Sequence, residues 1–240
     1  MDEIVTTTQT FDQHPLDPVQ RAERDLTARL KDLHEGDGLQ RPITPGPVFV
    51  LLAQAIGGLD FDVTPEVGAC EAAAKKLREA RPGGYYIEDR ARRSTPRTFG
   101  SLYPEPNVED DRFAYVHVSV DGMVELVSGE IADASSGLLI GLGLIEKWIQ
   151  VRDAEAMQAA FEALEADGPI VVAVALLRTQ GVEVRSDRTV PAGGGVLQVP
   201  YVTIKPRCFD DRSKLDAGGL NTMVGALWTA IVRQAGWARA

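Results

Sequence analysis

Hydrophobic residues recur every three or four positions in several stretches of the chain, which predicts amphipathic helices. The first predicted helix begins at Pro18 and ends before Gly36, a second covers residues 66–80, and Asp153 looks like the N-cap of another. The last should bury Met223, Leu227, Trp228 and Ile231. One more helix is predicted at residues 138–149. The apolar stripes behind four of these helices are Val19, Ala22, Leu26, Leu30 and Leu33; Leu138, Leu142, Ile145 and Ile149; Met157, Ala160, Phe161 and Leu164; and Leu220, Met223, Val224, Leu227, Trp228, Ile231 and Ala235.

Two continuous apolar runs, Val48–Ala55 and Ile170–Leu177, predict strands buried on both faces. Residues 113–120 alternate between polar and apolar, and the Asp121-Gly122 pair that follows favours a hairpin. A two-residue turn there would place Val118 opposite Glu125, and His117 opposite Leu126. Residues 196–205 predict a further strand. Mixed runs of strands and helices indicate an α+β domain with a mixed sheet, a hairpin and long amphipathic helices packed on it; a mixed α/β fold is the alternative.

The chain divides by composition into three predicted segments. Residues 1–17 are polar and rich in threonine, and we expect a mobile arm. Residues 18–112 hold a helical and strand segment with an irregular, arginine-rich loop, and residues 113–240 form the α+β core. Residues 18–240 as one continuous domain remain the alternative.

Composition is typical of a globular protein, with 44% hydrophobic and 25% charged residues. The net charge of -10 makes the chain a poor candidate for wrapping nucleic acid with its whole surface. The longest apolar run, residues 137–145, is shorter than the roughly 20 residues that span a bilayer. Cys70 and Cys208 lie far apart and are expected to be reduced thiols. We therefore expect an acidic cytoplasmic protein with no membrane association.

Sequence motifs for catalysis are lacking. His14, His34 and His117 are isolated, so no metal-ligand spacing is present. The glycine-rich segment 193–195 is not followed by the Lys-Ser/Thr pair of a phosphate-binding loop. The serines at 135–136 do not lie in the Gly-x-Ser-x-Gly motif of a nucleophilic serine. We therefore expect no metal, no cofactor and no catalytic residue, and lean away from an enzyme.

One face of the predicted hairpin carries Phe113, Tyr115 and His117. Two aromatic rings and an imidazole could line a ligand pocket, because pockets are mostly apolar with a few polar groups. We favour a second packed layer instead. Glu125 would face the core beside Val118, which requires either a position at the sheet rim or a partner such as an arginine.

A local excess of positive charge occurs at residues 90–97. This segment contains Arg90, Arg92, Arg93 and Arg97 and no acidic residue. Arginine forks bind phosphate in bidentate fashion, so this exposed, irregular segment is a candidate phosphate or partner site. The alternative, which we favour, is a solvated loop or pairing with the chain's own carboxylates.

The order of these segments resembles a known family region. The hairpin YVHVSVDGMVE, the Gly168-Pro169 strand, the strand VPYVTI and the last helix with Leu227-Trp228 carry the resemblance, over roughly residues 45–240. They are similar to the C-terminal region of bacterial proteins that begin with a Schlafen-like AlbA domain and are described as DNA-binding or ATP-binding. The 240 residues leave no room for the AlbA domain itself, so the resemblance transfers no functional residue.

Three functions follow as hypotheses. The first is a non-enzymatic interaction or ligand-sensing module of a bacterial regulatory or defence system, acting through a protein partner or a sensed ligand. The second is a nucleic-acid-associated protein that uses residues 90–97. The third is an enzyme with a site assembled from dispersed residues such as His117 and Glu125.

Overall fold

The computed structural model describes nine segments of the chain: residues 17–36, 46–56, 65–80, 92–95, 98–103, 114–129, 139–141, 151–185 and 195–236. Of the arm expected at residues 1–17, residues 1–16 lie outside these segments, and Asp17 is described as the residue before α1. Trp237, which follows the last helix, also lies outside them. The α-helices in these segments are α1 (Pro18–Glu35), α2 (Val67–Leu77), α4 (Val151–Ala163) and α5 (Ala217–Gln234), with a 3-10 turn, η3, at Arg212–Lys214.

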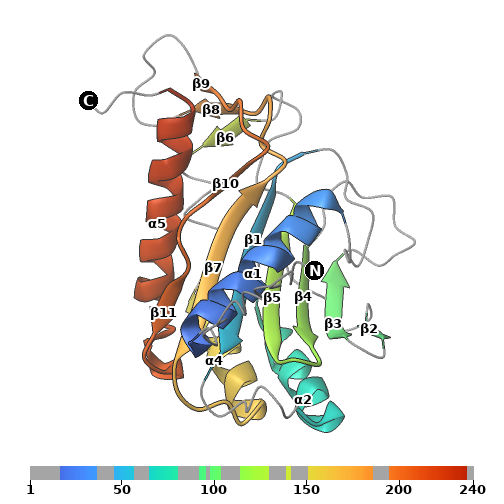
Figure 1. Cartoon of the computed structure of the whole chain (residues 1–240). Coiled ribbons are helices and arrows are strands. Elements are labelled where there is room, and N and C mark those ends of the chain that lie inside the picture. Colours follow the sequence, from blue (N-terminus) through green and yellow to red (C-terminus); the bar gives the residue numbers. More distant parts are fainter. Residues whose placement is uncertain are drawn as a thin grey trace, which may run out of the picture.

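The strands form one large sheet and one small sheet (Figure 1). The large sheet has the order β10-β7-β1-β5-β4-β3-β2, and β11 also pairs with β7. The small sheet has the order β6-β8-β9. The strands of the large sheet are β1 (Val48–Ala55), β2 (Arg92–Thr95), β3 (Thr98–Tyr103), β4 (Ala114–Ser119), β5 (Met123–Ser128), β7 (Ile170–Leu177), β10 (Tyr201–Thr203) and β11 (Arg207–Phe209); those of the small sheet are β6 (Leu139–Gly141), β8 (Glu183–Arg185) and β9 (Gly195–Val196).

The fold is α+β, as the pattern predicts. Neighbouring strands of the large sheet are antiparallel throughout, and the parallel pairing among the described strands joins β6 to β8. β1 comes from the first half of the chain but lies between β5 and β7. Both halves of the chain therefore contribute to one sheet.

Helices cover the two faces of the large sheet unequally. α1 lies across one face, where Leu26, Leu30 and Leu33 pack on the alternate side chains of β1 and β7 (Figure 1). The opposite face packs against α2, α4 and α5. Since β1 and β7 are buried along their whole length, they form the centre of this three-layer arrangement.

Helix α1 has clear signals at both ends. The Asp17 carboxylate accepts hydrogen bonds from the backbone N–H groups of Val19 (2.9 Å) and Gln20 (3.1 Å). These bonds satisfy two of the donors that a helix start leaves free. Gly36 ends the helix at φ 91°, a left-handed conformation that glycine adopts without strain. The predicted first helix is thus confirmed.

The hairpin turn is one residue longer than predicted. Val118 pairs with Val124 and His117 with Glu125, so three residues, 120–122, connect β4 to β5. Gly122 has φ 76°, and its N–H donates to Ser119 O at 3.0 Å, as in a turn followed by a left-handed residue. The predicted register is therefore wrong by one residue. Because side chains alternate, this shift moves Glu125 to the face of Tyr115 and His117.

Other element boundaries also differ from the prediction. Leu139–Gly141 is a strand where a helix is expected, because it pairs in parallel with β8. α4 begins at Val151, so Asp153 lies inside its first turn and is buried. The strand expected over residues 196–205 is two short strands in different sheets, β9 and β10.

The last helix is confirmed, with one correction to its buried face. α5 buries Leu220, Met223, Val224, Leu227 and Ile231. Trp228, predicted to be buried, is only half-buried, at the margin of the core. None of the helices in the described segments is long and apolar enough to cross a membrane.

This difference in burial predicts different stabilities for two neighbouring truncations. Leu227 is fully buried, so Leu227→Ala should lower the free energy of unfolding by about 2–5 kcal/mol through lost burial and a cavity. Trp228→Ala should cost less, because water already reaches part of the ring. Urea titrations of both variants measure the two losses. A larger loss for Trp228→Ala would contradict this packing.

Candidate functional site

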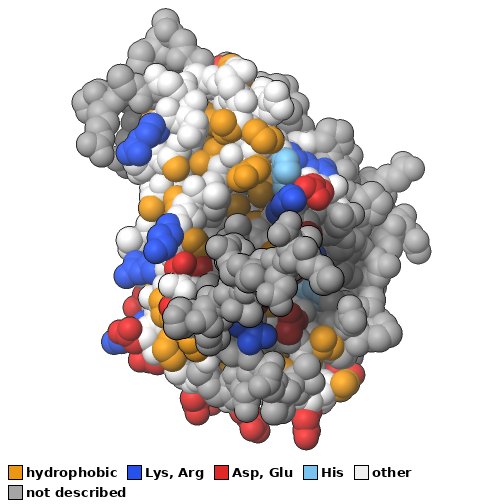
Figure 2. Space-filling view, viewed as in Figure 1, with side chains coloured by type: hydrophobic (Ala, Val, Ile, Leu, Met, Phe, Trp, Pro, Cys, Tyr) orange, Lys and Arg blue, Asp and Glu red, His pale blue; other side chains and the backbone are white. Residues whose placement is uncertain are grey.

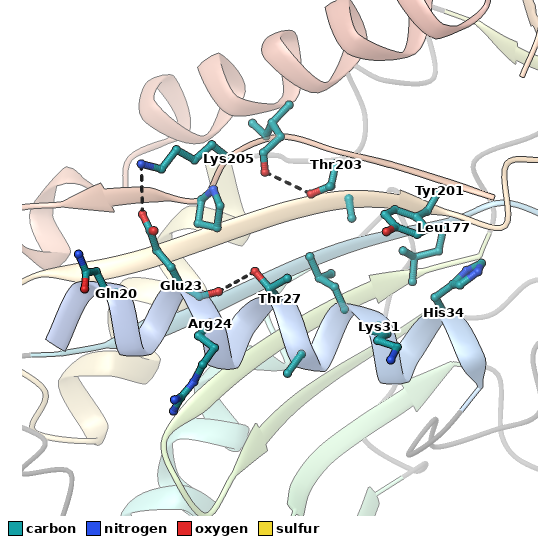
Figure 3. A pocket seen from close by; sticks show the side chains of 15 residues that line it. Gln20, Glu23, Arg24, Thr27, Lys31, His34, Leu177, Tyr201, Thr203 and Lys205 are labelled. Carbon is teal, nitrogen blue, oxygen red and sulfur yellow. Dashed lines mark hydrogen bonds and ion pairs between the residues drawn. The ribbon is translucent and has the colours of Figure 1, made fainter. Parts of the chain in front are cut away.

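A groove runs between α1 and the outer edge of the large sheet (Figure 3). Its volume is about 800 Å³, within the range of ligand pockets. It extends along α1 from Gln20 to His34, about 21 Å at 1.5 Å per residue. The groove is lined from α1 by Gln20, Glu23, Arg24, Thr27, Ala28, Leu30, Lys31 and His34, and from the sheet side by Ala175, Leu177, Tyr201, Thr203, Ile204, Lys205 and Pro206.

The floor of the groove consists of apolar side chains from the two walls. Leu30 comes from α1, and Ala175 and Leu177 come from β7. The side chains of β10 alternate, so Val202 enters the core beneath the sheet while Tyr201 and Thr203 face α1. Hydrophobic side chains are visible on this side of the molecular surface in Figure 2.

Contacts span the groove near both ends. The Lys205 ammonium lies 3.8 Å from the Glu23 carboxylate at one end. At the other end the rings of His34 and Tyr201 are 5.3 Å apart at a tilt of 59°. Figure 3 shows Glu23 and His34 pointing toward the sheet edge, whereas Arg24 points away from it.

The His34 end contains two features that suit a ligand. Tyr201 is 48% exposed, one of the most exposed large hydrophobic residues in the described segments. Nδ1 of His34 is buried and has no hydrogen-bond partner there. A buried polar atom without a partner is costly, and a bound polar group would satisfy it.

A second polar cluster lies buried on the other side of α1. Arg29 reaches from α1 to Glu125 of β5 through two hydrogen bonds, from Nε to Oε1 and from an Nη atom to Oε2 (3.1 Å). The Tyr115 hydroxyl also donates to Oε2, at 3.2 Å. Nδ1 of His117 lies 3.8 Å from the same oxygen, and its ring meets that of Tyr115 edge-on. Glu125 therefore has the arginine partner that its position requires.

Burial and charge determine how this cluster titrates. Burial alone would raise the pKa of Glu125, but nearby His117 and the hydrogen bonds and charge of Arg29 lower this pKa to about 2. Burial and the negative charge of Glu125 raise the pKa of Tyr115 well above its ordinary value. Burial would lower the pKa of Arg29, but Glu125 raises it. The cluster is thus an internally neutralised ion pair near neutral pH.

The candidate residues Tyr115 and His117 of a pocket, and Glu125 of a dispersed site, do lie together, while Phe113 lies outside the described residues. Each of the three described residues is at most 2% exposed, and none lines the groove. They belong to a packed layer beneath α1, as favoured from the sequence. His117 is not fully paired, because its Nε2 atom is buried without a partner among the described residues.

The arginine-rich segment is more regular than expected. The backbone of Arg92 and Arg93 belongs to β2, which pairs with β3 and forms the edge of the large sheet. Thr95 in β2, and Thr98 and Phe99 in the paired strand β3, are residue types that favour strands. Charged residues are common on edge strands, where they discourage unwanted pairing. Arg90 and Arg97 lie outside the described residues. Phosphate binding by these four arginines stays a prediction.

The described segments contain no group of three or more His, Cys, Asp or Glu residues placed to hold a metal ion. Cys70 and Cys208 are free thiols. Cys70 is a residue of α2 and is buried in the hydrophobic core between this helix and the large sheet. Burial raises the pKa of the Cys70 thiol, and the negative charge of Asp121 raises it further.

Comparison with known proteins identifies no relative. No protein-family model, curated protein or solved structure matches the chain. The resemblance to the C-terminal region of AlbA-domain proteins therefore stays a prediction.

The groove was not predicted from the sequence. Tyr201 and Thr203 do alternate with buried Val202, which is a sign of a two-faced strand. The sequence around His34 shows only an isolated histidine. No local pattern shows that these side chains, more than 160 positions apart, face one another.

Separating the two members of the buried ion pair should cost more than replacing both. Arg29→Met leaves Glu125, whose side chain is 3% exposed, without its cation, and should cost about 3–5 kcal/mol of stability. Glu125→Leu should cost less, because the Arg29 side chain is 20% exposed. The Arg29→Met/Glu125→Leu double variant should be more stable than Arg29→Met alone. Urea titrations of all four proteins test this, and strictly additive losses would contradict it.

The lowered pKa of Glu125 also predicts a pH dependence. Its folded value of about 2 lies below the ordinary 4.5, so the ionised carboxylate stabilises the fold above about pH 4.5. This contribution is lost as the pH falls toward 2. Glu125→Gln does not titrate, so its stability deficit relative to the wild type should shrink from about pH 5 to about pH 2.5. A constant deficit in urea titrations across this range would show that Glu125 is not held ionised.

Proposed function

We propose that this protein is a non-enzymatic recognition module that binds a ligand or partner in the groove between α1 and β10. The observation that carries the proposal is the groove itself, about 800 Å³ in volume with an apolar floor. Polar side chains stand at its rim. Ligand sites are concave and mainly apolar, with a few convergent polar groups that select and orient the ligand.

Two features of the lining favour recognition. Tyr201 offers an exposed aromatic ring, and aromatic side chains supply large contact area at low entropic cost. Nδ1 of His34 supplies an unsatisfied polar atom beside that ring. A ligand that covers the ring and reaches this atom would gain both apolar burial and a hydrogen bond.

The buried cluster supports a binding role over an enzymatic one. A general base must accept a proton near the working pH, whereas the pKa of Glu125 is about 2. Glu125 already receives hydrogen bonds from Arg29 and Tyr115. We assign these residues the role of holding α1 against the sheet.

Filling the groove should abolish recognition while the fold stays intact. Thr203 is an exposed residue of β10 whose hydroxyl donates to the backbone carbonyl of Val174 (3.2 Å). Thr203→Trp places an indole ring in the groove. Thr229→Trp is a matched control, because Thr229 is exposed on α5 and donates to Gly225 O (2.9 Å).

The measurement is isolation of the wild type and both variants from the cells that make the protein, followed by mass spectrometry of bound small molecules and proteins. We expect at least one species that the wild type and Thr229→Trp retain and Thr203→Trp loses. Thermal melting should show that both variants are folded. If the wild type retains nothing, or Thr203→Trp retains the same species, the groove is not the recognition site.

A further inference from the structure

The charge of the groove is opposite to that of the molecule. The chain has 25 basic and 35 acidic residues, yet the groove lining contains three cations, Arg24, Lys31 and Lys205, and one carboxylate, Glu23. Arg24 is paired with Asp25 at 3.1 Å, which leaves Lys31 and Lys205 against Glu23. A cleft with local positive potential attracts anions even when the whole protein is acidic. An anionic ligand therefore complements this groove better than a cationic one.

The charges are distributed unequally along the groove. At one end Glu23 neutralises Lys205 at 3.8 Å. At the other end Lys31 precedes His34 by three positions on α1, so the two are neighbours on the helix surface. In the described part of the chain Lys31 pairs with Glu35, at 3.8 Å, with both side chains more than half exposed, and such surface pairs are weak. The His34 end is thus the better place for an anionic group.

The same end supplies hydrogen-bond donors. The imidazole of His34 has a buried Nδ1 without a hydrogen-bond partner among the described residues, and the half-exposed Tyr201 beside it carries a phenol hydroxyl. Lys31 lies one helical turn away, closer than the Debye length of about 8 Å in physiological salt. One carboxylate can accept from His34 or Tyr201 while the ammonium of Lys31 balances its charge.

The rest of the groove is suited to a linear apolar chain. Leu30, Ala175 and Leu177 form its floor and are themselves almost fully buried, whereas Ile204 and Pro206, which are partly exposed, add apolar surface on the sheet side. The groove follows α1 for about 21 Å. Its length and its mainly apolar lining favour an extended aliphatic chain over a compact polar ligand.

We propose that the groove binds an amphiphile of the fatty-acid type, with its carboxylate at Lys31, His34 and Tyr201 and its aliphatic chain along Leu30, Ala175 and Leu177. This assignment rests on the proposed recognition role of the groove and names its ligand class.

The test is a titration of the ¹⁵N-labelled full chain with sodium dodecanoate below its micelle concentration, followed by NMR. We expect saturable shifts of the amide signals of Leu30, Ala175, Leu177 and Tyr201. Butanoate should bind at least tenfold more weakly because it buries fewer methylene groups. Dodecyltrimethylammonium, which has the same chain with a positive head, should also bind at least tenfold more weakly.

Matched variants separate the head from the chain. Lys31→Glu should weaken dodecanoate binding about fivefold through charge reversal. Lys75→Glu makes the same change of net charge at an exposed position of α2 that does not line the groove, and it should leave binding unchanged. Thr203→Trp should abolish the shifts, and Thr229→Trp should not.

Four results would overturn the assignment: absence of saturable dodecanoate binding, equal affinity for the cationic amphiphile, unchanged binding by Lys31→Glu, or shifts that lie outside the groove. If the species that Thr203→Trp loses in cells is a protein, the fatty-acid assignment is also wrong. In each of these cases the proposed recognition role still holds if Thr203→Trp loses a molecule that the wild type retains in cells. Failure of the fatty-acid assignment can therefore be told apart from failure of the recognition role.

Discussion

The buried ion pair between Arg29 and Glu125 determines where α1 lies on the sheet. A carboxylate with a side chain 3% exposed is stable as an ion only with a close partner, and that partner comes from α1. The helix must therefore lie over β1 and β7, within reach of β5. In this position α1 leaves the strip beside β10 uncovered, so the groove is a consequence of the same contact that holds the helix.

Elements with strong local signals could be predicted from the sequence. α1 has an aspartate cap, an apolar stripe and a glycine stop, and β1 and β7 are unbroken apolar runs. The short strands β2, β6, β8 and β11 escaped prediction, because three or four residues carry little periodicity and depend on distant pairing partners. At Leu139–Gly141 an apolar run typical of a helix pairs with β8 instead.

The candidate sites were predictable only where residues share one strand. Tyr115 and His117 are two positions apart, so their common face followed from strand alternation. Arg29 lies 96 positions from Glu125, and its place on a helix gave no sign of burial. The groove depends on α1 meeting β10, a contact between opposite ends of the chain. Contacts between such distant elements depend on tertiary packing, which local sequence patterns do not reveal.

The length of the β4–β5 connection decides which layer each side chain of β5 enters. Residues 120–122, with Gly122 in a left-handed conformation, place Glu125 beneath α1 and Val124 and Leu126 in the opposite core. An insertion or deletion of one residue there would exchange the two sets if the pairing followed the turn. The carboxylate would then enter the apolar layer with α2, far from Arg29. This loop should thus tolerate a change of residue type at the exposed Asp121, but neither a change of length nor a side chain at Gly122, whose φ of 76° favours glycine.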